Sequence, residues 1–265
     1  MLIDKRCKLC LINNRVNDLI KLNNDEKIPL ILESISKILN SNLSRDEMFS
    51  ISFKEIIKLT NKESPYKEMK LFLNDLGRKI AKVIEENLVK NSWDYKLAME
   101  FSAAANIIDT HVLGFEPLDL KEAIWEKPLI YDDINLSKNR TIYFVADNSG
   151  EIYIDFLLVK ALKAHGFEVK LVIREEPYEI DISSSDDIKF DIMTPGNYSP
   201  IKYLNDGFII SKGIANLEAY LENEVKLDSL HLFRAKCDVL AEKFKVKKNM
   251  PIIISGQRAY KILKK

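Results

Sequence analysis

Two acidic residues and an amide stand at points in the chain where metal or phosphate chemistry is expected. Asp147 and Asn148 follow a short apolar run, and Ser149 and Gly150 then turn into a helical pattern. Asp181 lies about one β-α-β unit further along the chain. Carboxylate and amide oxygens are hard ligands that suit magnesium or manganese rather than a thiolate-binding metal. The residues therefore predict a divalent-metal site made of Asp147, Asn148 and Asp181.

The turn is followed by a feature that favours an anion. Ser149, Gly150 and Glu151 open a predicted helix, where free N–H groups and the positive end of the helix dipole attract negative charge. Lys212 ends a later apolar run and could add a cation at the same place. A metal ion, oriented amides and a lysine together suit a phosphate monoester. Taken alone, the spacing predicts a metal or phosphate site and does not choose a reaction.

Each of these side chains also has a structural interpretation. Asp147 could cap a helix, and Asn148 to Gly150 could form only a turn. Asp181 could cap a short helix at the following "SSSDD", and Lys212 could be the solvated end of a strand. Convergence beyond the carboxyl ends of neighbouring parallel strands, where ligands bind, favours a site over these separate interpretations.

Composition and missing motifs argue against several classes. The chain has 265 residues, of which 46% are hydrophobic and 30% charged, and Lys plus Arg equals Asp plus Glu at 40 each. This balance gives no support to binding of nucleic acid or a membrane surface. No signal peptide or membrane-spanning run is expected, which predicts a cytoplasmic protein. The sequence lacks G-x-G-x-x-G, the P-loop and G-x-S-x-G, so dinucleotide binding, a P-loop NTPase and a Ser-His-Asp hydrolase are not expected.

The cysteines give a weak signal. Cys7 and Cys10 have the spacing of half a zinc site, but Cys237 stands alone and the three histidines have no ligand spacing with them. A structural zinc site completed by distant residues, a local disulfide and a pair of packed thiols all stay open.

The first part of the chain is predicted to be helical. Apolar residues recur at helical spacing in residues 9–22 and 28–39. Ser44 and Glu47 form a capping box that predicts a helix up to residue 59.

More helices are predicted before the sequence changes, after residue 140, to runs rich in β-branched residues. Ser64-Pro65 marks a helix start, and a further helix is predicted over residues 93–113, with residues 114–140 as a connector. The helix after Pro65 places five apolar residues on one face: Met69, Phe72, Leu76, Ile80 and Val83.

After residue 140, short runs rich in β-branched residues alternate with helical patterns. Near-continuous apolar strands separated by helices predict a parallel sheet covered on both faces. We predict an α/β fold, with a helical domain over residues 1–128 followed by a doubly wound, mainly parallel Rossmann-like α/β/α sheet domain over residues 129–265. The predicted strands lie at residues 141–147, 169–175, 190–196, 207–213 and 251–255, and the first crossover helix is expected to bury Ile152, Phe156, Val159 and Leu162.

The motifs at these positions resemble those of one known family. D-N-x-G-E-x-x-x-D appears as Asp147 to Asp155, and K-G-x-x-N-x-E appears as Lys212 to Glu218. "FRAKCD" is similar to the family's late K-x-K-C-type segment, and the N-terminal CxxC, "SPYKEMK" and "AAANIID" match in order. Over essentially the whole chain, these motifs resemble the damage-control phosphatase family, formerly domain of unknown function 89, in its CxxC-bearing, largely prokaryotic and archaeal branch.

The resemblance implies a metal-dependent phosphatase of small phosphometabolites, such as sugar phosphates or damaged cofactor precursors. It implies one divalent ion (Mn, Ni, Co or Mg) held by Asp147, Asn148 and Asp181. The other implied site residues are Lys212 and Lys236, which face the phosphate; Asn106 and Asp109, which reach from the helical domain to close the pocket; and Asn216 and Glu218, which line it or brace Lys212.

Alternatives remain open for both the reaction mechanism and the class of function. Attack on phosphorus could come from a metal-activated water or from a carboxylate, with Asp147 as the candidate for a covalent intermediate. Glu151 or Asp155 could act as a base or orient Lys212. An S-adenosylmethionine-dependent carboxyl methyltransferase and a non-catalytic metal- or phosphometabolite-binding protein are the alternative functions. The sequence does not predict the physiological substrate, the native metal or the oligomeric state.

Overall fold

The computed structural model describes residues 4–107, 120–132, 134–177, 179–184, 186 and 188–264. Within these residues, a seven-stranded sheet has the order β1-β7-β6-β5-β2-β3-β4. Neighbouring strands run parallel except β6 and β7, so the predicted mainly parallel sheet is confirmed. The strands are β1 (Leu129–Ile130), β2 (Ile142–Val145), β3 (Val169–Arg174), β4 (Ile192–Thr194), β5 (Phe208–Lys212), β6 (Ser229–Arg234) and β7 (Pro251–Ser255).

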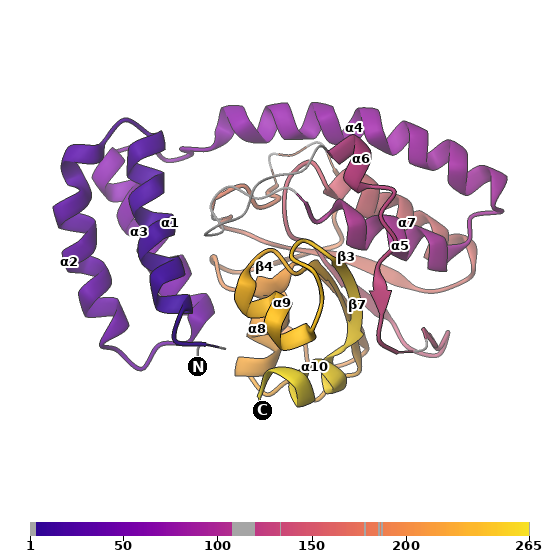
Figure 1. Ribbon diagram of the computed structural model, residues 1–265. Helices are drawn as coiled ribbons and strands as arrows, with labels where there is room; N and C mark the ends of the chain where they lie inside the picture. Colours follow the sequence, from indigo (N-terminus) through magenta and orange to yellow (C-terminus); the bar gives the residue numbers. More distant parts are fainter. Residues whose placement is uncertain are drawn as a thin grey trace.

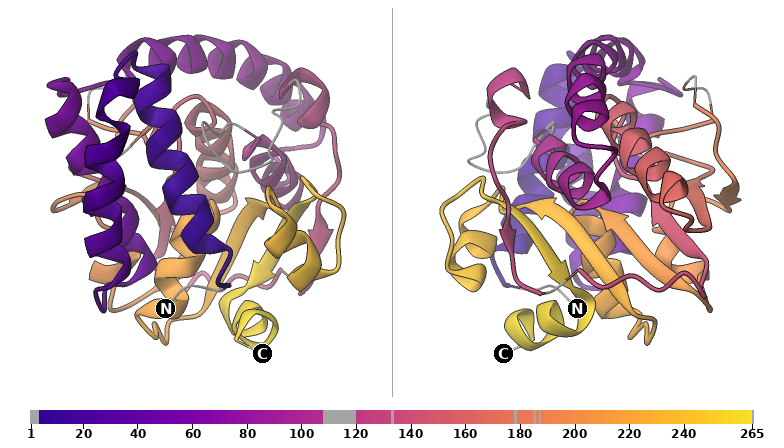
Figure 2. Two further views of the ribbon diagram at one scale, coloured as in Figure 1. Left: turned by 60° about the vertical axis from the view of Figure 1, so that its left-hand side comes forward. Right: turned by 90° about the vertical axis from the view of Figure 1, so that its right-hand side faces the viewer.

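The helices form three groups around this sheet, and α8, α9 and α10 make up the one on its second face. The first three pack on one another beside it, and Figure 1 shows the long α4 running from this bundle across the top of the view. α4 and α5 instead pack on α7, the first crossover helix, as both views in Figure 2 show. The helices are α1 (Cys7–Lys21), α2 (Ile28–Leu39), α3 (Arg45–Thr60), α4 (Lys67–Lys90), α5 (Tyr95–Ala105), α6 (Leu120–Ala123), α7 (Ile152–Ala164), α8 (Ile214–Glu222), α9 (Asp238–Phe244) and α10 (Gly256–Leu263), with short 3-10 helices at Asp25–Lys27 and Pro200–Tyr203.

The two faces of the sheet build separate apolar cores, because alternate strand residues point to opposite sides. Phe144 of β2 belongs to the core that contains residues of α5 and α7. Its neighbour Val145 belongs to the core that contains Leu217 of α8 and Leu240 of α9. Helices therefore cover both faces, and the predicted doubly wound α/β fold is confirmed.

The core on the first face also reaches the N-terminal bundle. Leu11 of α1 and Ile56 of α3 belong to the same apolar cluster as Phe144. The domain boundary near residue 128 stays a prediction. Among the described helices, none combines the length and the apolar composition that a bilayer crossing requires.

Local signals in the sequence located some helix ends well. Ser44 Oγ accepts a hydrogen bond from the Glu47 N–H, and the Glu47 carboxylate accepts one from the Ser44 N–H, so the capping box is confirmed. The helix predicted over 93–113 is wrong at its end, because α5 stops at Ala105 with Asn106 as its C-cap.

Two predicted apolar faces are partly wrong. On α4, Phe72 is 68% exposed, and Met69 and Val83 are exposed as well. The buried side of that helix includes Lys70, Asn74 and Gly77 instead. Phe156 of α7 is 42% exposed. The first half of α4 buries polar rather than apolar residues because its inner face meets a polar loop rather than a strand.

Strand β6 was missed because its sequence, "SLHLFR", alternates polar and apolar residues. All six residues are nevertheless buried. His231 is satisfied inside the sheet by the hydroxyls of Ser211, 2.7 Å from Nδ1, and Ser229, 3.0 Å from Nε2. Burial lowers the pKa of this histidine to about 3, so it remains neutral.

Candidate functional site

Two of the predicted site residues, Asp147 and Lys212, lie where the strand order of the sheet reverses. Strand β2 pairs with β3 on one side and with β5 on the other, and Val145 is in register with Ser211. The segments that follow β2 and β5 therefore leave the sheet side by side. Asp147 follows β2, and Lys212 ends β5. In open parallel sheets this reversal point is where ligands bind.

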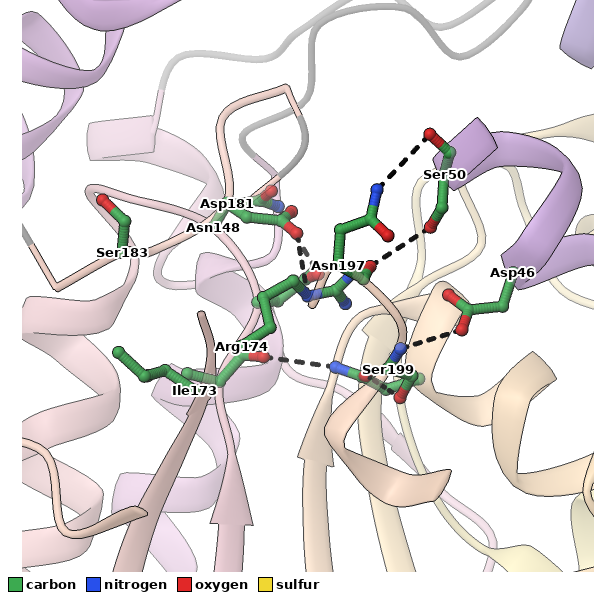
Figure 3. Close-up of polar contacts among 12 residues, drawn as sticks. Asp46, Ser50, Asn148, Ile173, Arg174, Asp181, Ser183, Asn197 and Ser199 are labelled. Atoms are coloured by element: carbon green, nitrogen blue, oxygen red, sulfur yellow. Dashed lines mark hydrogen bonds and ion pairs between the residues drawn. The ribbon is translucent and has the colours of Figure 1, made fainter. Parts of the chain in front are cut away.

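Asn148 and Asp181 face each other across a short antiparallel bridge. The Ser149 N–H donates to the Ile180 carbonyl at 2.8 Å, and the Ile182 N–H donates to the Asp147 carbonyl at 2.9 Å. Asn148 and Asp181 are therefore a non-hydrogen-bonded pair, the arrangement in which opposed side chains lie closest. Figure 3 shows their side chains next to each other.

The carboxylate of Asp147 is held by two amides. Asn106 and Asn148 each donate from Nδ2 to its Oδ2 at 3.2 Å. Burial and the carboxylates of Glu151 and Asp181 raise the pKa of Asp147 well above its ordinary value, while Lys236 and Arg174 act to lower it. Asp147 thus lies among other acids in a site where a cation would be stabilised.

Lys212 is fully buried between two further acids. Its Nζ lies 2.7 Å from Glu151 Oε2 and 2.8 Å from Asp155 Oδ1. Burial acts to lower the pKa of Lys212, but the two carboxylates outweigh it and raise that pKa. Asn106 also donates to Glu151, at 3.0 and 3.2 Å, so Glu151 connects the lysine to the amide that holds Asp147.

The structural interpretations of three residues do not hold. The N-cap position of α7 is Glu151, without a side-chain capping bond, so Asp147 is not a helix cap. The described residues after Asp181 do not form a helix, so Asp181 caps none there. Lys212 has no exposed surface and is not a solvated strand end.

The amides expected to cradle a phosphate are used elsewhere. The Ser149 N–H donates to Ile180, and the Gly150 N–H donates to Asn74 Oδ1 at 2.8 Å. Glu151 contributes its carboxylate to Lys212 instead of a phosphate contact. The structure therefore corrects the expectation that the N–H groups of Ser149 and Gly150 bind an anion, because both already donate to protein groups.

The remaining predicted residues divide between the site and its surroundings. Asn216 donates to the backbone carbonyl of Lys212 at 2.8 Å and accepts from Ser199 Oγ at 2.6 Å, so it braces the end of β5. Glu218 lies with Arg45 of α3, 2.8 Å from its Nε, and is not part of the Asp147 cluster. Lys236 is buried and within electrostatic reach of Asp147. Asp109 lies outside the described residues.

Arg174, the last residue of β3, was not predicted. Its Nε lies 3.1 Å from Asp181 Oδ2, and its Nη1 donates to the Asn197 carbonyl at 2.8 Å. A charged residue at the carboxyl end of a buried strand was the signal that could have identified it. Ser50 of α3 also donates to the Asn197 carbonyl, at 3.1 Å. Figure 3 shows this path from Asp181 through Arg174 and Asn197 to α3.

A divalent metal ion fits the chemistry of the residues that converge here. No group of three His, Cys, Asp or Glu side chains able to hold a metal occurs in the described part of the chain. The candidate set instead consists of two carboxylates, Asp147 and Asp181, and the amide of Asn148. Because Nδ2 of Asn148 donates to Asp147 and Glu151, its amide oxygen is the atom that could bind a cation. Three hard oxygen donors suit Mg²⁺ or Mn²⁺ better than a soft metal.

The cysteines are free thiols. Cys7 and Cys10 lie in the first turn of α1 and form no disulfide, and Cys237 precedes α9. Of the three interpretations of the CxxC pair, packed thiols fit this arrangement. Burial raises the pKa of Cys7 and of Cys237, which keeps both protonated.

Comparison with known proteins gives matches over most of the chain. The family model described as "Damage-control phosphatase ARMT1-like domain" matches residues 3–191. Damage-control phosphatase PH1575 of Pyrococcus horikoshii is 26% identical over 285 residues, covering 94% of this chain and 96% of that protein. A damage-control phosphatase of Archaeoglobus fulgidus is 25% identical, covering 84% of this chain and 85% of the relative.

A solved structure supports the fold. The crystal structure of a DUF89 family protein from Pyrococcus horikoshii matches with a TM-score of 0.75 at 24% sequence identity. The match covers 97% of this chain and 99% of the other.

Proposed function

Because this chain belongs to the damage-control phosphatase ARMT1-like family, we propose that it is a divalent-metal-dependent phosphatase of small phosphorylated metabolites. The observation that carries the proposal is the convergence of Asp147, Asn148 and Asp181 at the reversal point of the sheet. The names of the relatives support phosphatase activity, and the hard oxygen donors support an ion such as magnesium or manganese.

Asp147 is the main reactive group of the proposed site. Its Oδ2 already accepts from two amides, those of Asn106 and Asn148. We assign the other oxygen of this carboxylate, Oδ1, to binding the metal ion or to attack on phosphorus. A divalent ion held by Asp147, Asn148 and Asp181 would supply Lewis-acid polarisation of a phosphate oxygen.

Arg174 and Lys236 are the cations assigned to the phosphate. Both act to lower the pKa of Asp147, against the larger raising effect of burial and the neighbouring carboxylates, which is consistent with positive charge close to its carboxylate. Lys212 has a different assignment, because its ammonium is enclosed by Glu151 and Asp155. It holds Glu151 in place, and Glu151 in turn orients the amides of Asn106 and Asn148.

We assign the organic part of the substrate to a cavity whose lining includes Ser183, two residues beyond Asp181 in the chain. This cavity of about 700 Å³ opens between α3, the start of α4 and the segment after β3. Tyr66, Lys70, Ser183 and Asn197 are among its lining residues. Hydroxyl, ammonium and amide groups in this lining favour a polar, hydroxylated leaving group such as a sugar over an apolar one.

Hydrolysis of p-nitrophenyl phosphate tests the proposal. Metal-stripped protein would be assayed after separate addition of Mg²⁺, Mn²⁺, Co²⁺ and Ni²⁺. We expect an ion to restore activity and Asp147→Ala and Asp181→Ala to abolish it, while Glu33→Ala, which removes an exposed carboxylate on α2, retains it. Normal metal-dependent turnover by Asp147→Ala would contradict the assignment. Folded wild-type protein that binds phosphate esters without hydrolysing any of them would favour the binding-protein alternative.

A further inference from the structure

Helix α4 turns a polar stripe toward the candidate metal site. Lys70, Asn74 and Gly77 follow one another at helical spacing and are buried. Apolar Phe72, on the same helix, is instead exposed. Burying polar groups is costly unless they are hydrogen-bonded, so the partners of this stripe indicate what it does.

Asn74 joins the two segments that carry the proposed metal ligands. Its Oδ1 accepts the N–H of Gly150 at 2.8 Å, in the turn that begins with Asp147 and Asn148. Its Nδ2 donates to Oδ1 of Asp186, in the segment that begins with Asp181. One side chain of α4 therefore fixes both sides of the Asn148–Asp181 pair.

Neighbouring contacts hold Asn74 in this position. A Cβ built on Gly77 would overlap the carbonyl oxygen of Gly150, so the helix backbone lies directly against the turn. Gly150 has a φ of 83°, a conformation that favours glycine. Both glycines are needed for α4 and the turn to approach so closely.

Asp186 collects hydrogen bonds from the same region. It accepts from the Ser183 N–H at 2.8 Å, and the ammonium of Lys70 lies 3.1 Å from its Oδ2. Lys70 also donates to Ser183 Oγ at 2.8 Å. Asp186 therefore holds the segment after Asp181 in shape by accepting these hydrogen bonds. Asn74 and Lys70 attach that segment to α4.

We propose that Asn74 is a positioning residue that sets the distance between the Asp147–Asn148 turn and Asp181, so that the affinity of the site for a divalent ion is controlled from α4. This inference rests on the proposed function. Partners that orient metal ligands without touching the metal typically contribute 10- to 100-fold in metal affinity. We expect ~10- to 100-fold weaker Mn²⁺ binding when the Asn74–Asp186 pair is mismatched.

A reciprocal exchange of the pair gives the sharpest test. Asn74→Asp keeps an acceptor for Gly150 but sets two carboxylates against each other. Asp186→Asn removes the carboxylate that Lys70 and Ser183 share. The double variant Asn74→Asp/Asp186→Asn keeps an acceptor for Gly150 and restores one amide–carboxylate hydrogen bond between the two positions. We expect both single variants to lose Mn²⁺ affinity and the double variant to regain most of it.

Two further measurements separate positioning from general stability. Hydrogen exchange of the Gly150 amide in metal-free protein reports the Asn74 contact directly, and we expect Asn74→Ala to lose its protection. Ser52→Ala, which removes a buried hydroxyl bonded within α3, is the matched control. It should lower the melting temperature without changing Mn²⁺ affinity or Gly150 exchange.

The outcomes distinguish this inference from the proposed function. Unchanged Mn²⁺ affinity in the single variants, unchanged Gly150 exchange in Asn74→Ala, or failure of the double variant to restore Mn²⁺ affinity would overturn the role of Asn74. If wild-type protein binds no divalent ion, the proposed function fails. The exchange of Gly150 then decides by itself whether Asn74 holds the turn.

Discussion

The carboxylate of Asp147 packs directly against the Cα atom of Gly213. Gly213 has a φ of 75°, and a Cβ built on it would overlap Oδ2 of Asp147. The position needs glycine for its backbone conformation and for the absence of a side chain. Gly213 also links β5 to α8, so the start of that helix meets the end of β2 at the candidate metal site.

We expect Gly213→Ala to displace Asp147 and to weaken Mn²⁺ binding by more than about tenfold, measured by calorimetry. Gly196→Ala is the matched control, because Gly196 has a φ of 69° and nothing within 4 Å of a built Cβ. Both changes place an L-residue in the left-handed region at a cost of about 1–2 kcal/mol. Equal losses of Mn²⁺ affinity in the two variants would show that the overlap with Asp147 does not matter.

The stability of the protein should depend on the protonation of Glu218. Burial raises the pKa of Glu218 from 4.5 to about 7, although Arg45 acts to lower it and Glu222 and Asp46 raise it further. Between these values the folded protein binds more protons than the unfolded chain, so the free energy of unfolding falls as the pH rises. We expect the free energy of unfolding of Glu218→Gln to increase relative to that of wild type by roughly 1 kcal/mol for each pH unit of rise across this window.

Urea denaturation of metal-free wild type and Glu218→Gln at pH 5 and pH 7 measures this difference. A difference in unfolding free energy that stays constant between the two pH values would contradict the role of Glu218.

Arg174 should stabilise the metal-free protein by compensating the charge of Asp181. Arg174→Ala removes the guanidinium 3.1 Å from the Asp181 carboxylate, and both side chains are buried. Removing one partner of a buried pair costs about 3–5 kcal/mol of unfolding free energy. We expect Mn²⁺ to recover part of this loss, so its addition should raise the melting temperature more in the variant than in wild type.

Arg174→Lys is the control for this prediction. It keeps the charge but lacks the planar fork that reaches Asp181 and Asn197 together, so a smaller loss is expected. Wild-type melting behaviour of Arg174→Ala, with and without Mn²⁺, would exclude compensation of Asp181 by Arg174.

Lys212 should be required for folding stability rather than for binding phosphate. Lys212→Met leaves Glu151 and Asp155 buried without their shared cation, at a cost of about 3–5 kcal/mol. Burial and Glu151 raise the pKa of Asp155 to about 7 even with Lys212 present. Adding Asp155→Asn to Lys212→Met should therefore recover part of the stability, as measured by urea denaturation. If the second substitution recovers nothing, the charge balance assigned to Lys212 is wrong.

The sequence located the polar residues at the strand ends because strand order and ligand position are linked in parallel sheets. Asp147, Asn148 and Lys212 could be identified in this way, since they follow runs of β-branched residues. Asp181 was expected near Asp147, but its approach through an antiparallel bridge to Asn148 depends on a loop whose path the sequence does not encode locally.

Other parts of the site could not be predicted, because they reverse the usual pattern of burial. The apolar periodicity of α4 favours Phe72 as an inner residue, whereas the loop on Gly150 selects Asn74. From the sequence alone Lys212 resembles a surface residue, whereas in the structure Glu151 and Asp155 enclose it. Long-range polar contacts decide these positions, and single-sequence periodicity does not report them.

Calorimetric titration of Mn²⁺ into metal-stripped wild type and Asp147→Asn tests the metal site itself. The substitution preserves the size of the side chain and removes the charge. We predict one Mn²⁺ ion per chain in wild type and binding weakened by at least about 100-fold in the variant, because a hard divalent ion depends on anionic oxygen. Equal Mn²⁺ affinity in the two proteins would contradict the assignment of Asp147 as a metal ligand.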